Sequence, residues 1–286
     1  MKIALCLSGQ SRKVDTRGIK IDWTDALPYF RKNLLDLHEI DIFIHTWDNP
    51  GDNELKSDLI RDFSPAGIKI EKSIFPNYDV ERLNLNIPFD KGHYTGSTGI
   101  QAAMSRWDSQ QKSNEIRKRF QEETGDSYDF ILCCRFDLLL YSPFPFDKMN
   151  PAHYYVSNWH AFWNPEDRFY GYQDCWFISG DENTNVHCDL FDDLINYWQD
   201  DSDLSSYCIN FLKQKQSVKF SSHVLSRWHM LNKGLISNER YYGVEYETWS
   251  LSRKKDIKKN PHWTVPWGAH KIFNPQKIIN KMLDQK

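Results

Sequence analysis

The run from Asp129 to Leu140 constrains the fold of this chain more than any other stretch. After Asp129 it is apolar except for two charged residues, Arg135 and Asp137, which stand two positions apart. In a strand, residues i and i+2 lie on the same face, so these two side chains are expected to project together. An apolar run of this kind is typical of a strand buried on both faces in a parallel sheet. Charges at its end form either a ligand site at the carboxyl edge or a buried ion pair.

The chain before this run alternates between short apolar segments and segments with helical spacing of apolar residues. Strands are expected at 2–8, 41–48 and 68–74, and helices at 23–38 and 54–63. Such alternation is typical of a parallel sheet flanked by helices. The part after residue 140 is less regular and rich in aromatic residues, which make up 15% of the whole chain. We therefore predict an α/β fold, a mostly parallel sheet with an irregular, aromatic-rich second half.

A long helix is expected at 98–124, because apolar residues recur there at helical spacing. The residues that share one face of this helix are Ile100, Ala103, Met104 and Trp107. The same stripe continues to two amides, Gln111 and Asn114. Amides on this line either satisfy buried backbone groups or line a cavity. Gln111 is the one we take as a candidate ligand-binding residue.

The turn after the first strand, Ser8-Gly9-Gln10-Ser11-Arg12, contains small residues that let backbone N–H groups approach a phosphate or a base. Neither the fingerprint G-x-G-x-x-G nor the P-loop pattern G-x-x-x-x-G-K-[ST] is present in the sequence. The turn therefore indicates a nucleotide site only together with other residues. His45, at the end of the second expected strand, is either a packed residue or part of the same site.

Charge, hydropathy and cysteine usage narrow the classes of partner. The formal net charge of −3 argues against a nucleic-acid partner, which would require a basic surface. No segment reaches the ~18 apolar residues of a transmembrane helix. The basic run Arg253–Lys259 is either a solvated loop or a peripheral contact with phosphate or a membrane surface. The six cysteines include no C-x-x-C pair and are expected to be reduced thiols, so we predict a cytoplasmic protein.

Three blocks of the sequence together resemble GT-A-type glycosyltransferases of bacteria and viruses. The blocks are Lys2–Arg12, Asp41–Trp47, and Tyr128–Ile131 leading into Arg135-Phe136-Asp137. The resemblance covers roughly the first half of the chain and extends more weakly to 174–178. It implies one domain over 1–286 with a GT-A-like, Rossmann-like sheet, a nucleotide-binding half (1–140) and an acceptor-side half (141–286). The implied activity is hexosyl transfer from a nucleotide-sugar donor to a glycan or other hydroxyl acceptor, in polysaccharide biosynthesis.

In GT-A enzymes a D-x-D motif ends a central strand and binds a divalent metal that bridges the diphosphate of the donor. This sequence has Arg135-Phe136-Asp137 in that place, with arginine at the first acidic position. The resemblance implies that Asp137 is a ligand to Mn²⁺ or Mg²⁺, which favour oxygen donors. Arg135 is expected to neutralise the diphosphate directly, because its planar fork suits phosphate oxygens. The sequence leaves open whether a metal or arginine supplies the positive charge.

The resemblance also suggests which other residues contact donor and acceptor. Those expected to hold the nucleotide are Ser8, Gly9, Gln10, Arg12 and His45. Asp174 is either the base that takes the proton of the acceptor hydroxyl in an inverting reaction or a structural aspartate at a strand edge. Some GT-A enzymes recruit a late histidine to the metal, for which His223, His262 and His270 are the candidates.

Two other functions are compatible with the sequence. A glycan-binding protein without catalysis would contact sugars through Trp159, Trp163 and Trp176, since aromatic rings stack on sugar faces. In that case the arginine at the first motif position would mark lost metal binding. Another nucleotide-using transferase, such as a sulfotransferase or a nucleotidyltransferase, is less favoured because the sequence contains no phosphate-loop motif.

Overall fold

The computed structural model describes residues 1–14, 20–72, 97–159, 171–212, 216–243, 248–252 and 271–275. Their strands are β1 (Lys2–Gly9), β2 (Arg12–Val14), β3 (Lys20–Asp22), β4 (Glu39–Trp47), β5 (Gly67–Glu71), β6 (Phe130–Arg135), β7 (Leu138–Leu140), β8 (Tyr154–Trp159), β9 (Gly171–Ser179), β10 (Glu239–Tyr241) and β11 (Trp249–Leu251). Their α-helices are α1 (Leu27–Phe30), α2 (Leu55–Phe63), α3 (Ser97–Thr124), α4 (Asp181–Cys188), α5 (Leu190–Trp198), α6 (Asp203–Ser206) and α7 (Ser222–Asn232).

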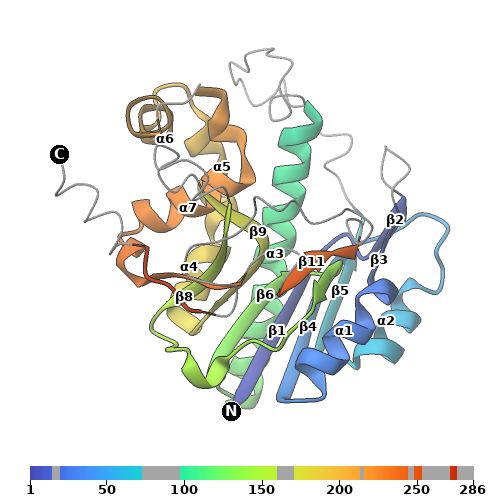
Figure 1. Cartoon of the computed structure of the whole chain (residues 1–286). Coiled ribbons are helices and arrows are strands. Elements are labelled where there is room, and N and C mark those ends of the chain that lie inside the picture. The colour runs from blue at the N-terminus through green and yellow to red at the C-terminus, as the bar shows by residue number, and fades with distance from the viewer. Residues whose placement is uncertain are drawn as a thin grey trace.

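The main sheet of the described residues has seven strands in the order β10-β8-β9-β6-β1-β4-β5 (Figure 1). β1 pairs in parallel with β4 and with β6, and β4 pairs in parallel with β5. β9 is antiparallel to both of its neighbours, β6 and β8, while β10 is parallel to β8. The predicted mostly parallel sheet flanked by helices is therefore confirmed.

The central strand β1 is buried on both faces of the sheet. Leu5 belongs to an apolar cluster with Phe30 of α1, on the face that α1 and α2 cover. Cys6 belongs to another cluster, on the opposite face of the sheet. That cluster includes Met230 of α7, and Phe120 of α3 packs against it. In Figure 1, α3 crosses behind the central strands while α1 lies in front of them. This alternation explains why the strand reads as a continuous apolar run.

The run Asp129–Leu140 forms two strands, and the prediction of a single strand is wrong in this respect. β6 ends at Arg135, a turn covers 136–137, and β7 then pairs with β11 in a separate small sheet. Within β6 the side chains alternate between the two faces of the sheet, because Cys133 and Cys134 belong to clusters on opposite faces. The turn places Asp137 just beyond the carboxyl end of the strand.

The helix expected at 23–38 is present as three short pieces. A 3-10 turn (Trp23–Asp25) leads into α1, and a π-helical turn (Arg31–Leu35) follows it. Asp22 caps the first turn by accepting a hydrogen bond from the backbone N–H of Thr24 at 3.0 Å. In contrast, the long helix expected at 98–124 is continuous as α3.

None of the helices in the described ranges is both long and apolar enough to cross a membrane. All six cysteines are buried and free of disulfides. The basic run 253–259 lies outside the described residues, as do His262 and His270.

Candidate functional site

The carboxyl edge of the main sheet has a topological switch point between β1 and β6. From β1 the chain moves to β4 and β5 on one side of β1, and it later returns to β6 on the other side. In open α/β sheets, ligands bind outside the carboxyl ends of the strands at such a point. Here those two strands end at Gly9 and Arg135.

Three of the predicted site residues form a row across this edge. Ser8 is the register partner of His45 on β4 and of Arg135 on β6. Register partners in a parallel sheet share a face, and this is the face that α3 covers, as the cluster around Cys6 and Cys133 indicates. The structure therefore brings together residues that are far apart in the sequence.

Arg135 and Asp137 form a bidentate ion pair. Nε of Arg135 donates to Oδ1 of Asp137 at 2.8 Å and Nη2 donates to Oδ2 at 3.0 Å. The Asp137 side chain is only 2% exposed and that of Arg135 is 18% exposed. Burial acts to lower the pKa of the Arg135 guanidinium. The effect of the Asp137 carboxylate is larger than that of burial and holds this pKa above its ordinary value.

The geometry of Asp137 does not fit a divalent metal. Such a cation requires several oxygen ligands with available charge, whereas both Asp137 oxygens accept hydrogen bonds from a guanidinium. Within the described ranges, no group of three or more His, Cys, Asp or Glu side chains could hold a metal ion. The residues present thus do not match the metal that the resemblance implies.

Arg106, on α3, is the site residue that sequence reasoning missed. Its Nη1 donates to Ser8 Oγ at 2.9 Å, and its Nε and Nη2 donate to the backbone carbonyl of Asp174 at 3.4 and 3.0 Å. Burial lowers the pKa of Arg106, while the Asp174 carboxylate acts to raise it and Arg135 to lower it further. The sequence did show a positively charged residue, Arg106, next to Trp107 of the predicted buried stripe. Nothing in the sequence showed, however, that this helix crosses over β1.

Asp174 reaches the same edge because β9 runs antiparallel to β6, so that its first residues lie beside the end of β6. Its carboxylate is 17% exposed, and Oδ1 lies 3.7 Å from Nδ1 of His223 on α7. The same ring nitrogen lies 2.7 Å from the backbone carbonyl of Tyr172. We therefore assign the proton of His223 to Nδ1. The structure thus places one of the three late histidines next to the candidate base.

His45 takes part in a buried hydrogen-bond chain beneath the turn after β1. Its Nδ1 lies 2.8 Å from Ser109 Oγ and its Nε2 lies 3.0 Å from Oε2 of Glu71. The N–H of Gly9 donates to Ser109 Oγ at 2.7 Å. Burial is the main cause that lowers the pKa of His45 to about 4, so the ring is neutral. We assign its proton to Nε2, which leaves Nδ1 to accept from the Ser109 hydroxyl.

Glu71, at the end of this chain, stays ionised. Burial acts to raise the pKa of its carboxyl, but hydrogen bonds, led by that from Lys112, lower it to about 2. Lys112 of α3 also pairs with Asp108 at 2.9 Å. The network joins α3 to the ends of β4 and β5 and fixes the backbone turn at Gly9, whose φ of 97° is a value that favours glycine.

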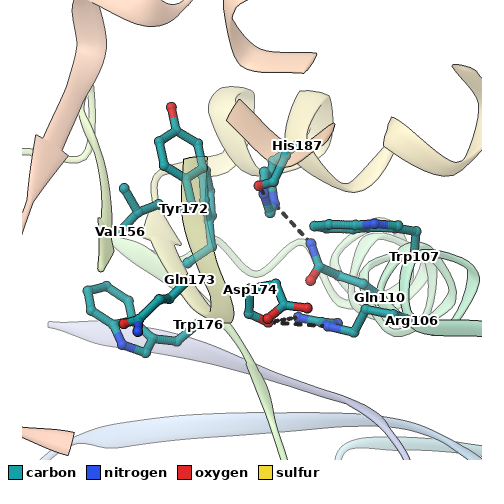
Figure 2. A pocket seen from close by; sticks show the side chains of 11 residues that line it. Arg106, Trp107, Gln110, Val156, Tyr172, Gln173, Asp174, Trp176 and His187 are labelled. Carbon is teal, nitrogen blue, oxygen red and sulfur yellow. Dashed lines mark hydrogen bonds between the residues drawn. The ribbon is translucent and has the colours of Figure 1, made fainter. Parts of the chain in front are cut away.

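A small pocket adjoins Arg106 and Asp174 (Figure 2). Its lining includes His187, which is held by Gln110 at 2.9 Å and by Ser226 at 2.9 Å. Burial lowers the pKa of His187 well below its ordinary value, so this ring is also neutral. The pocket has room for about one water molecule.

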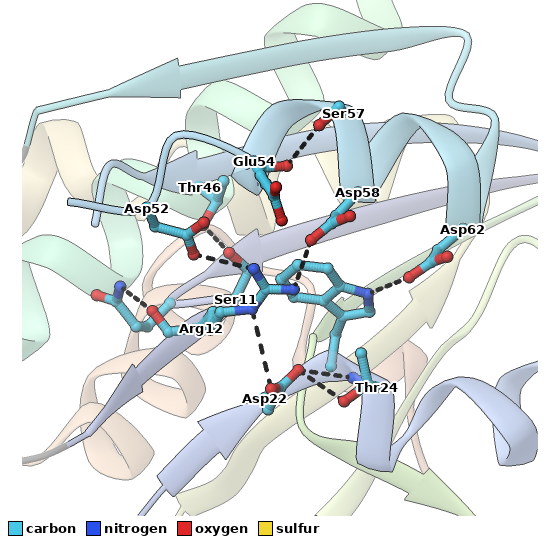
Figure 3. Close-up of polar contacts among 12 residues, drawn as sticks. Ser11, Arg12, Asp22, Thr24, Thr46, Asp52, Glu54, Ser57, Asp58 and Asp62 are labelled. Carbon is cyan, nitrogen blue, oxygen red and sulfur yellow. Dashed lines mark hydrogen bonds and ion pairs between the residues drawn. The ribbon is translucent and has the colours of Figure 1, made fainter. Parts of the chain in front are cut away.

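Two other predicted nucleotide-binding residues, Arg12 and Gln10, form hydrogen bonds within the protein. Arg12 is held by Asp52 at 3.0 Å and by Asp58 at 2.9 Å, and it stacks over the ring of Trp23 (Figure 3). Its charge is therefore already balanced by carboxylates. Gln10 donates to the carbonyl of Arg12 at 3.2 Å. A nucleotide contact from either residue remains a prediction.

The amides of α3 also have defined partners. Gln111 donates to Asp192 of α5 at 2.8 Å, and Asn114 donates to Asn185 of α4 at 3.0 Å. The amide that lines the pocket is Gln110, one position before the predicted Gln111. Both predicted amides therefore connect helices through side-chain partners, which is neither of the two expected alternatives.

Trp176, one of the three tryptophans proposed as a sugar platform, is 2% exposed and belongs to the apolar core. Its ring packs against Phe144 with centroids 5.1 Å apart. The side chain of Trp159, and Trp163 as a whole, lie outside the described residues. The core position of Trp176 does not favour a glycan-binding role for its ring.

Comparisons with known proteins give no independent identification. No protein-family model matches the sequence, and a search of curated proteins finds no match.

Proposed function

We propose that this chain is a glycosyltransferase that moves a sugar from a nucleotide-sugar donor to a glycan or other hydroxyl acceptor. The observation that carries the proposal is that two guanidinium groups, Arg106 and Arg135, flank Ser8 at the topological switch point. Ligands of open α/β sheets bind at this position, and guanidinium groups match phosphate oxygens. The resemblance of the three sequence blocks adds the GT-A type and the sugar donor.

In the proposed reaction, the acceptor hydroxyl oxygen attacks the anomeric carbon of the donor sugar. The bond from that carbon to the diphosphate oxygen breaks, and the nucleoside diphosphate leaves with the electron pair. Positive charge beside the departing oxygens stabilises the transition state, and Arg106 and Arg135 supply it. If the reaction inverts configuration, the carboxylate of Asp174 takes the proton of the hydroxyl.

His223 supports Asp174 in this scheme. With its Nδ1 proton directed at the Tyr172 carbonyl and 3.7 Å from Asp174, the ring limits where the carboxylate can move. A cytoplasmic location belongs to the same proposal, because buried free thiols are typical of reducing compartments.

The proposal is tested by measuring nucleoside diphosphate release from a panel of nucleotide-sugars, each with and without Mn²⁺ or Mg²⁺. We expect at least one donor to be hydrolysed or transferred, and Asp174→Asn to lower the rate about 10²-fold or more. The matched control is Asp192→Asn, which changes an exposed aspartate on α5. A cooperatively folded protein that releases diphosphate from no donor under any condition would contradict the proposal.

A further inference from the structure

Arg106 carries a positive charge that no carboxylate balances directly within the described part of the chain. Its hydrogen bonds all go to neutral oxygens, namely the Ser8 hydroxyl and the backbone carbonyl of Asp174. Taking a cation out of water without a paired anion is costly. The side chain nevertheless reaches the switch point, where its Nη1 donates to Ser8 near the end of β1. An anion there would restore the balance. Arg106 also lines the neighbouring pocket beside β9 (Figure 2).

Arg135 adds a second guanidinium with a donor to spare. Its Nε and Nη2 donate to Asp137, whereas among the described residues Nη1 has no hydrogen-bond partner. Asp137 thereby fixes the orientation of the guanidinium plane while leaving one edge for another ligand. Arg135 is close enough to Arg106 to lower the pKa of Arg106. Ser8 links the two, because it is the register partner of Arg135 and accepts a hydrogen bond from Arg106.

Two adjacent guanidinium groups suit a ligand with two adjacent anionic groups. We infer that Arg106 and Arg135 bind the diphosphate of a nucleoside diphosphate directly, in the role that a divalent cation has where a complete D-x-D motif is present. This inference rests on the proposed function and specifies how the donor is held. It also explains why an arginine stands at the first motif position and why the carboxylate at the last position is bonded to it.

Isothermal titration calorimetry on the full chain tests the inference. The probes are the diphosphates of uridine, guanosine, cytidine, thymidine and adenosine, and inorganic pyrophosphate, each in EDTA and in Mn²⁺. We expect the wild-type protein to bind at least one of the nucleoside diphosphates in EDTA, with less than about threefold change on adding Mn²⁺. Arg106→Met is expected to weaken this binding at least about tenfold, because a charge-assisted hydrogen bond to phosphate is lost.

The matched control is Arg240→Met, because Arg240 on β10 likewise donates to backbone carbonyls but belongs to the outermost strand of the sheet. Arg106→Lys keeps the positive charge but not the planar set of N–H donors of the guanidinium. We expect the affinity of this variant for the nucleoside diphosphate to lie between those of the wild type and Arg106→Met. Binding that appears only with Mn²⁺ would overturn the inference while leaving the proposed function standing. Binding in EDTA that Arg106→Met leaves unchanged would also overturn it. No binding of any nucleoside diphosphate in either condition would overturn both.

Discussion

At the scale of single residues, Asp137 shows how one position can match a motif and yet have a partner that the motif does not predict. Its place in the sequence corresponds to the last acidic position of D-x-D, and this alone predicts a metal ligand. In the structure both of its oxygens accept from Arg135 and the side chain is 2% exposed. The arginine two positions earlier changes the chemistry of the aspartate, because a guanidinium at that distance takes the oxygens that a metal would use.

Asp137→Ala is accordingly expected to lower the free energy of unfolding by about 3 kcal/mol, because it leaves the Arg135 charge largely buried without its partner. Urea denaturation measures this as a lower midpoint at unchanged slope. The double variant Arg135→Leu/Asp137→Leu should recover part of the loss, since neither charge is then left unpaired. A single variant as stable as the wild type would contradict a structural ion pair and revive the metal-ligand role of Asp137.

At the scale of secondary-structure elements, the close approach of β9 and α7 holds His223 against Asp174. A Cβ added to Gly171 would lie 2.4 Å from the backbone carbonyl oxygen of His223. By comparison, a Cβ added to Gly67 would lie 2.4 Å from Cγ2 of Ile116, which is a side-chain atom that can move. An added Cβ would therefore come equally close to a neighbouring atom at both glycines, but only the neighbour of Gly67 is free to move away.

Gly171→Ala should destabilise the protein by about 2–3 kcal/mol, because the backbone of α7 has to shift, whereas Gly67→Ala should cost about 1 kcal/mol. Chemical denaturation of both variants measures the difference. We also expect Gly171→Ala to reduce any activity that depends on Asp174, and Gly67→Ala to leave it intact. Equal destabilisation by the two substitutions would show that the β9–α7 contact is not rigid.

The sequence predicted elements better than it predicted their contacts. α3 and the strands β1, β4 and β5 follow the expected ranges because apolar spacing reports directly on burial. The break after Arg135 was missed, since Leu138–Leu140 continue the apolar pattern although they pair with β11 rather than extending β6. Arg106 was missed for a related reason: its role arises from where α3 crosses the sheet, which no local pattern encodes.

At the scale of the whole molecule, buried neutral histidines make stability depend on pH. Burial lowers the pKa of both His45 and His229 to about 4, from an ordinary value of 6.5. Below pH 6.5 the unfolded chain therefore binds protons that the native protein does not, so stability falls as the pH drops from 6.5 to 4. Each of these histidines accounts for a loss of about 3 kcal/mol across that range.

Urea denaturation between pH 7 and pH 4.5 should therefore show a steadily decreasing free energy of unfolding. His229→Gln should flatten the profile, because one of the buried histidines that cause it no longer titrates, even if the substitution lowers the stability at pH 7. Below pH 4.5 the loss should continue as Glu71, whose pKa is lowered to about 2, becomes protonated more readily in the unfolded chain. A free energy of unfolding that is constant from pH 7 to pH 4.5 would contradict the neutral burial of these rings.

The most direct measurement of the central claim is a crystal structure of the protein with the nucleoside diphosphate that binds best in calorimetry. The account predicts that the diphosphate lies at the carboxyl ends of β1 and β6, within hydrogen-bond distance of Arg106 and Arg135. A diphosphate bound at another part of the molecule, with both guanidinium groups still held only by Ser8, Asp137 and the Asp174 carbonyl, would contradict it.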